Sequence, residues 1–178
     1  MTPATVEGAV IFSDLVGFTE FNGARGDAAA VDVLDRHRAL MDDAIVASDA
    51  RVVKELGDGL LVWATSPAGA LRVATRFLVG LLDARAAGTF PLAVRIGVHA
   101  GTVHRRGDDI VGQTVNVAAR IVNLAGPGEI LVSDQVLDGC AELGSLAVRS
   151  VGPTSVKGVA ETVWLHRVEL TGDPAGLL

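Results

Sequence analysis

Two strand-like segments joined by a glycine-rich turn lie between two helical patterns, and this arrangement limits the possible folds more than any other feature of the sequence. The runs Arg51 to Leu56 and Leu60 to Ala64 flank Gly57-Asp58-Gly59, a pattern typical of a β-hairpin. Apolar residues at spacings of three and four predict an amphipathic helix over about residues 24–48. A second helix is predicted over Pro67 to Ala86, because the first turn of a helix tolerates proline.

The segments on either side extend this order to βαββαβ. The run Ala9-Val10-Ile11-Phe12 predicts a buried first strand, and alternating apolar residues from Leu92 to Val98 predict another, with Thr102 to Arg106 returning as its hairpin partner. The order predicts an α+β fold with a ferredoxin-like core and additional C-terminal elements, in which helices cover one face of an antiparallel sheet. Those further elements are a third helix over about residues 113–125 and short strands near Ile130, Val148 and Trp164.

Length and composition limit the class of protein. At 178 residues the chain is expected to form a single domain over residues 1–178, with a core of about 6–168. The formal net charge of -6 argues against non-specific binding to nucleic acid, which requires a basic surface. A single cysteine, Cys140, excludes an internal disulfide and favours the cytoplasm. Charged residues and Ser66-Pro67 interrupt the apolar stretch of residues 60–82, so no membrane-spanning segment is expected.

Two acidic residues lie where strands are predicted to end. Asp14 follows the first strand, and Asp58 occupies the hairpin turn. Each has a simpler interpretation on its own, since Asp14 is a suitable helix cap and Asp-Gly is a common turn. If the first strand lies beside the hairpin, the two carboxylates form a hard-oxygen site of the kind that holds Mg²⁺ in phosphoryl chemistry. The N–H groups of Phe18 and Thr19, at the start of a helix, would then face a phosphate.

Two further pairs offer polar groups to a nucleotide. Asn116 and Arg120 share a helix face, where Arg120 offers a donor fork to a phosphate that gains charge and Asn116 orients a sugar oxygen; the alternative is a solvated polar face. Lys54 can donate to N1 of adenine and Asp109 can accept from its N6 amino group, whereas guanine reverses both demands. The alternative for this second pair is two ordinary surface residues.

The three pairs lie in segments that resemble the class III nucleotidyl cyclase family. The matching segments are FSDLVGFT at residues 12–19, VKELGDG at residues 53–59 and DIVGQTVNVAAR at residues 109–120. The match in motif order extends over about residues 6–168. The resemblance implies a short-arm adenylyl cyclase domain that converts ATP to 3′,5′-cyclic AMP and pyrophosphate.

The resemblance also implies where metal and base are bound. Positions matching Asp14, Leu15 and Asp58 hold two divalent cations, Mg²⁺ or Mn²⁺. Positions matching Lys54 and Asp109 specify adenine, whereas guanylyl members usually carry Glu and a small residue such as Cys. Lys54 and Asp109 therefore favour ATP over GTP.

The remaining implied roles concern the triphosphate, the transition state and a partner. Asn116 and Arg120 match positions that stabilise ribose and the transition state. Lys157 resembles a lysine on the triphosphate, with a surface lysine as the alternative, and Phe18 and Thr19 lie at the phosphate-binding helix start. The family builds each site from two chains, so a homodimer with two composite sites is expected.

Several alternatives stay open at this point. Asp108 replaces Asp109 if the register slips by one, although Asp109 lies seven residues before Asn116, the spacing that the family uses. The short segment between Ala100-Gly101 and this acid leaves the strength of dimerisation open. A guanylyl or mixed-specificity cyclase and a catalytically silent nucleotide-binding or dimerisation domain remain alternative functions.

The histidines are assigned no chemistry. His37, between Arg36 and Arg38, is expected on a solvated helix face. His99 and His104 are expected on hairpin strands without a Cys or His partner at metal-ligand spacing.

Overall fold

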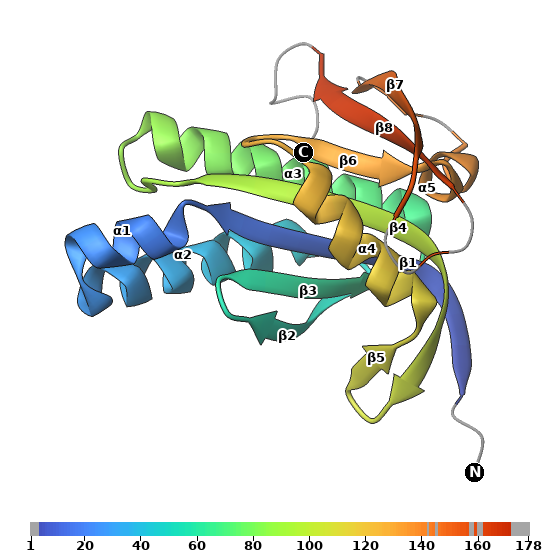
Figure 1. The fold of residues 1–178 in the computed structure, drawn as a ribbon, viewed down its shortest axis with the longest axis horizontal. Helices are drawn as coiled ribbons and strands as arrows, with labels where there is room; N and C mark the ends of the chain where they lie inside the picture. The colour runs from blue at the N-terminus through green and yellow to red at the C-terminus, as the bar shows by residue number, and fades with distance from the viewer. Residues whose placement is uncertain (1–3, 142, 145, 157–158, 160–161, 172–178) are drawn as a thin grey trace.

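The computed structural model describes residues 4–141, 143–144, 146–156, 159 and 162–171, and these form eight strands and five helices (Figure 1). In chain order the elements are β1 (Thr5–Val16), α1 (Phe18–Arg25), α2 (Asp27–Ile45), β2 (Ala50–Leu56), β3 (Gly59–Ala64), α3 (Pro67–Ala86), β4 (Ala93–Arg106), β5 (Asp109–Val111), α4 (Gln113–Leu124), β6 (Ile130–Ser133), α5 (Asp134–Asp138), β7 (Leu146–Thr154) and β8 (Val163–Leu170). Among these described elements, no helix is both long and apolar enough to cross a membrane.

All eight strands belong to one sheet. The strand order is β2-β3-β1-β4-β6-β8-β7, and β5 pairs with the far end of β4. Neighbouring strands are antiparallel except β4 and β6, which run parallel. The predicted α+β class is confirmed: α2 and α3 pack on one side of the sheet, and α4 crosses the other side in front of β1 and β4 (Figure 1).

Strand β1 is an interior strand of the sheet, and most of its side chains are buried on both faces. It pairs with β3 on one edge and along its whole length with β4 on the other. Ala9 and Ile11 face the larger core under α2 and α3, whereas Val10 and Phe12 face the smaller cluster under α4. The period of two along a strand therefore places Asp14 on the same face as Val10 and Phe12.

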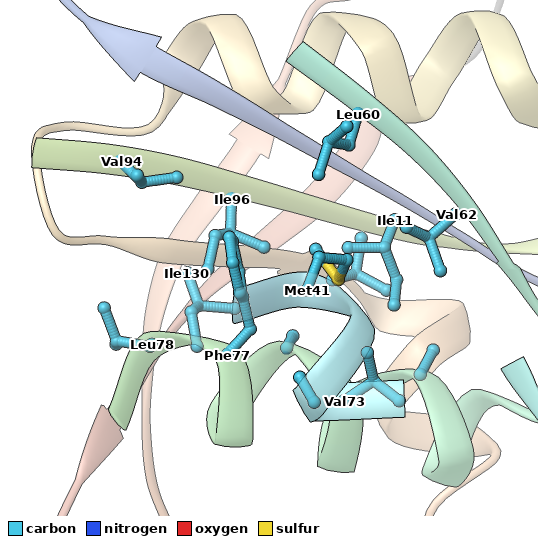
Figure 2. Close-up of a cluster of buried hydrophobic side chains, with 14 of the residues drawn as sticks. Ile11, Met41, Leu60, Val62, Val73, Phe77, Leu78, Val94, Ile96 and Ile130 are labelled. Carbon is cyan, nitrogen blue, oxygen red and sulfur yellow. The ribbon is translucent and has the colours of Figure 1, made fainter. Parts of the chain in front are cut away.

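The larger core explains why α2 and α3 form where they do. Figure 2 shows Met41 of α2 and Phe77 of α3 packed against Ile11 of β1 and Ile96 of β4. The start of α3 is fixed by Ser66, whose Oγ accepts a hydrogen bond from the Gly69 N–H at 3.1 Å, and proline occupies the first turn. The predicted bounds of this helix are confirmed.

Two glycines on β4 allow α4 to lie close to the sheet. A Cβ added to Gly97 would lie 2.4 Å from the Val122 nitrogen, and one added to Gly101 would lie 2.8 Å from Thr114 Oγ1. Both distances are shorter than van der Waals contact, so a larger residue at either position would push the helix away. The third helix and the short strands near Ile130, Val148 and Trp164 are confirmed.

The predicted return of Thr102 to Arg106 as a hairpin partner is wrong. These residues continue β4 in a straight line, with Gly101 paired to Gly8 and His104 paired to Thr5 of β1. The glycine that suggested a turn serves instead for the close approach of α4. The chain reverses later, at Gly107, whose φ of 62° lies in the left-handed region, and β5 is the actual partner strand.

The predicted helix over residues 24–48 is divided and shorter. Gly26, with a φ of 81°, separates α1 from α2, which ends at Ile45 because Val46 is extended. Helix α5 was not predicted; its five residues are too few to show a helical period.

Candidate active site

The β1–β3 ladder brings the two predicted acidic residues together. Asp14 is the cross-strand partner of Gly59, and Asp58 directly precedes Gly59 in the hairpin turn. A Cβ at Gly59 would lie 2.8 Å from the Ser13 carbonyl oxygen and 3.5 Å from Asp14 Oδ1, so glycine is required for this approach. Gly57 adopts a φ of 65°, which closes the turn.

Electrostatics confirms that the two carboxylates are neighbours. The pKa of Asp58 is raised, first by burial and then by the negative charge of Asp14. Hydrogen bonding to backbone and the positive charge of Arg95 act in the opposite direction. A divalent cation placed between the two acids would therefore relieve repulsion that is present without it.

Arg95 belongs to this acidic centre, and the sequence analysis missed it. It is the cross-strand partner of Asp14 in β4, and its Nε donates to Asp14 Oδ2 at 2.7 Å. Both side chains are largely buried, with 29% and 23% of their surface exposed. The sequence did contain an indication of this role. Arg95 lies between Val94 and Ile96 in a strand, so alternation places its side chain on the opposite face from theirs, which is the face of Asp14.

The donor set suits a hard cation that shares its coordination with a substrate. Mg²⁺ is commonly held by one or two carboxylates together with phosphate oxygens and water. Within the described residues no three or more His, Cys, Asp or Glu side chains form a metal-binding group. The Leu15 side chain packs in the larger core, so this residue has only main-chain atoms to offer a cation.

The start of α1 lies directly after the acidic centre. Gly17 adopts a φ of 76°, and the first helical bond runs from the Phe21 N–H to the Gly17 carbonyl at 2.9 Å. The N–H groups of Phe18 and Thr19 therefore have no acceptor within the helix. Lys157, the other predicted phosphate ligand, lies outside the described residues.

Lys54 and Asp109 form a direct ion pair. Lys54 Nζ lies 2.7 Å from Asp109 Oδ2, and each side chain is 38% exposed. The Asp109 Oδ1 accepts a hydrogen bond from the Ile110 N–H at 2.8 Å. These bonds, the lysine first, lower the pKa of Asp109. Asp109, and not Asp108, thus presents its carboxylate to Lys54.

A bulge sets the direction of the lysine. The β2–β3 register shifts between Val52 and Lys54, which makes Leu61 the partner of Lys54. Leu61 lies in the smaller cluster under α4. The lysine is therefore on the α4 face of the sheet, as is Asp14.

Asn116 and Arg120 lie on the outer side of α4. The buried side of this helix carries Thr114, Val117, Ala118, Ile121 and Val122, whereas Asn116 and Arg120 are exposed. At 100° per residue the two polar residues point almost opposite to the buried side. The structure thus brings together the members of each pair, but Arg120 points away from the sheet that carries Asp14.

The expectation for His37 is wrong. This side chain is 1% exposed, on the buried side of α2 with Val33 and Met41, which lie four residues before and after it. Its Nε2 lies 3.1 Å from Ser13 Oγ, directly beneath the acidic centre, and burial lowers the pKa of His37 to about 4. His99 is buried as well, with Nδ1 2.7 Å from Ser133 Oγ and a pKa of about 4.

Comparison with known proteins places this chain in a family. Residues 3–167 match the family model described as the adenylate and guanylate cyclase catalytic domain. A pH-sensitive adenylate cyclase of Mycobacterium tuberculosis is 31% identical over 169 residues, which cover 93% of this chain and 41% of the relative. An uncharacterised protein of the same species is 36% identical over 157 residues, or 88% of this chain and 40% of that protein. The chain thus spans about 40% of the length of these relatives.

Solved structures agree on the fold. The adenylyl cyclase CyaB from P. aeruginosa superimposes with a TM-score of 0.80 at 24% identity, covering 98% of this chain and 99% of that one. A guanylyl cyclase, Cya2, gives 0.78 at 25% identity, covering 98% and 97%. The fold therefore does not distinguish the two purines. With the family model matching nearly its whole length, the chain belongs to the class III nucleotidyl cyclase family, as a catalytic domain.

Proposed function

We propose that this domain is an adenylyl cyclase, which converts ATP to 3′,5′-cyclic AMP and pyrophosphate at sites shared by two copies of the chain. The Lys54–Asp109 contact of 2.7 Å is the observation that supports adenine. The ammonium group is a donor for N1 of adenine, and the carboxylate is an acceptor for its N6 amino group. Guanine has an N1–H donor where adenine has an acceptor and an O6 acceptor where adenine has a donor. The Lys54–Asp109 pair would therefore disfavour guanine.

Asp14 and Asp58, with main-chain atoms of Leu15, would hold two divalent cations, Mg²⁺ or Mn²⁺. The chemistry that such cations would supply is a lowered pKa of the ribose 3′-hydroxyl and neutralisation of charge on the triphosphate. Arg95 orients Asp14 through its 2.7 Å bond. The N–H groups of Phe18 and Thr19 would receive phosphate oxygens at the helix start.

The reaction is an in-line displacement. The 3′-oxygen forms a bond to the α-phosphorus, the bond from that phosphorus to the bridging oxygen breaks, and pyrophosphate leaves while the hydroxyl loses its proton. Arg120 would stabilise the additional negative charge on the phosphorus oxygens, since a guanidinium offers planar, paired donors. Asn116 would hold the ribose so that the 3′-oxygen faces the phosphorus.

A second copy is needed because of the direction of Arg120. Its side chain leaves α4 on the side away from the sheet, whereas Asp14 lies on the sheet. Leu124, which lies one turn after Arg120 on α4, is an apolar side chain that is 50% exposed. A twofold dimer through this face would join the acids of one copy to Lys54, Asp109, Asn116 and Arg120 of the other, at two equivalent sites.

The first test is product formation. The chain is incubated with ATP or GTP, each with Mg²⁺ or Mn²⁺, and both cyclic nucleotides are measured, with Asp14→Ala as the inactive control. We expect cyclic AMP to form with at least one metal and to exceed cyclic GTP at equal substrate. Equal formation of both products would indicate a mixed-specificity cyclase, and no product with any combination would indicate a silent domain.

A further inference from the structure

Arg51 links the two segments that carry the base-facing pair. It lies in β2, three residues before Lys54, and its Nη1 donates to the main-chain oxygen of Asp108 at 3.0 Å. Asp108 is in the β4–β5 turn, directly before Asp109. Two side chains of β2 therefore reach this hairpin: Arg51 bonds to Asp108, and Lys54 bonds to Asp109.

We propose that Arg51 is a positioning residue that determines purine selectivity, by holding the β4–β5 turn so that Asp109 stays in reach of Lys54 and of the N6 amino group of adenine. This inference rests on the proposed function, because it concerns how the same base-facing pair is held. Arg51 itself need not touch the nucleotide.

Strand pairing fixes β5 to β4 but does not join the β4–β5 turn to β2. β5 has three residues and pairs with β4 alone, and β2 pairs with β3 alone. Thus no ladder of backbone hydrogen bonds connects β2 to β5 among the described strands. Without Arg51, the hydrogen bond that still joins β2 to this turn region would be that of the Lys54 ammonium, a flexible side chain that forms a point contact.

Packing anchors Ile110 of β5, which is buried with Leu61 and Trp63, but it does not hold the exposed Asp108 in the turn. Arg51 lines a hollow of about 320 Å³ whose other walls include Trp63, Arg105 and Ile110. Its guanidinium reaches the turn along this hollow and is exposed. An exposed side-chain bond adds little to overall stability, so its removal should leave the fold intact. Arg105 lines the same hollow and has no hydrogen bond to Asp108, which makes it a matched control.

The first test compares ATP with purine ribonucleoside triphosphate, which lacks the N6 amino group. In Arg51→Met we expect the ratio of kcat/KM for ATP to that for the analogue to fall roughly threefold to tenfold, the range of one ordinary hydrogen bond. The kcat/KM for the analogue should not change, and Arg105→Met should keep the wild-type ratio. An unchanged ratio in Arg51→Met, or an equal fall in Arg105→Met, would overturn the proposal.

Two additional measurements separate positioning from general damage. In an Asp109→Ala background, Arg51→Met should cause no further loss of the ratio, since the group it positions is gone. In the folded protein, carboxyl NMR should show that Arg51→Met raises the pKa of Asp109 toward its ordinary value, whereas Arg105→Met does not. This titration needs no turnover, so a chain without cyclase activity would refute the proposed function and still test the role of Arg51. An Asp109 pKa that is unchanged by Arg51→Met would overturn that role.

Discussion

The acidic centre and the base-facing pair are held by different kinds of contact. Asp14 and Asp58 meet because backbone ladders place Gly59 beside Asp14, and Arg95 completes the centre from the next strand. Lys54 and Asp109 meet through their side chains alone, on a bulged strand and a three-residue strand. The Asp14–Arg95 pair in the first region is largely buried, and the Lys54–Asp109 pair in the second is more exposed.

This difference shows which part of the site is free to vary. A centre fixed by strand register changes only if the sheet changes, because a shift by one residue would turn Asp14 to the other face. A pair fixed by side chains changes with a single substitution and leaves the sheet as it is. Under the proposed function, the acids that would hold the metal are fixed by strand register, whereas the residues that would select the purine are fixed by side-chain contacts.

The largest effect is expected from Asp58→Asn. We expect cyclic AMP formation to fall about a thousandfold, because one of two carboxylates for the cations is lost. Thermal stability should stay the same or rise slightly, since repulsion with Asp14 is removed. The rate and the melting temperature are measured together, with Asp32→Asn on the exposed side of α2 as control. A variant that keeps a tenth of the activity would mean that Asp58 does not bind the metal.

The next effect is a loss of folding stability at low pH, caused by protonation of the buried His37. His37 has a pKa of about 4 in the folded chain, below the ordinary 6.5 that it regains on unfolding. The unfolded state therefore takes up the proton first, and stability is lost as the pH falls from 6.5 toward 4, by about 3 kcal/mol for this group. His99 acts in the same direction.

Urea unfolding at several pH values checks this prediction. In His37→Gln the fall in unfolding free energy between pH 6.5 and 4 should be about half of that in the wild type, because His99 remains. His104→Gln, at an exposed position, should behave like the wild type. A wild-type stability that does not change over this range would show that neither histidine is neutral when folded.

A smaller effect is expected from the base-facing pair. Lys54→Glu with Asp109→Gly should lower the preference for ATP over GTP by roughly 10- to 100-fold, because the donor and the acceptor for adenine are both removed. The fall in unfolding free energy between pH 6.5 and 4 that His37 and His99 cause should be the same as in the wild type. Competition between the two nucleotides measures the preference. An unchanged preference would mean that these residues do not contact the base.

The smallest effect concerns an exposed ion pair beside Lys54. Arg38 of α2 contacts Glu55 of β2 at 2.9 Å, and both side chains are well exposed. Such pairs contribute less than about 1 kcal/mol, so Glu55→Gln, which leaves the Arg38–Asp42 pair in place, should change stability by less than that and activity by less than about twofold. Denaturant unfolding measures the change in stability, and the rate of cyclic AMP formation from ATP measures the change in activity. A tenfold loss of activity would show that α2 helps to position β2.

The same difference explains what the sequence could predict. The strand and helix order followed from hydrophobic period, and Asp14 and Asp58 followed from their places at strand ends. Arg95 and His37 were missed because their partners, Asp14 and Ser13, are distant in the sequence and are set only by register and helix rotation. The false turn at Gly101 arose because a glycine needed for packing against Thr114 looks the same in sequence as one needed for a turn.

The claim that two copies share each site is tested most directly by complementation. Asp14→Ala and Arg120→Ala chains are each checked for folding and dimerisation, assayed alone, and then mixed so that their subunits exchange. Each variant alone should form almost no cyclic AMP, and the mixture should recover activity at one intact site per mixed dimer. A mixture that stays inactive although mixed dimers form would contradict the shared site.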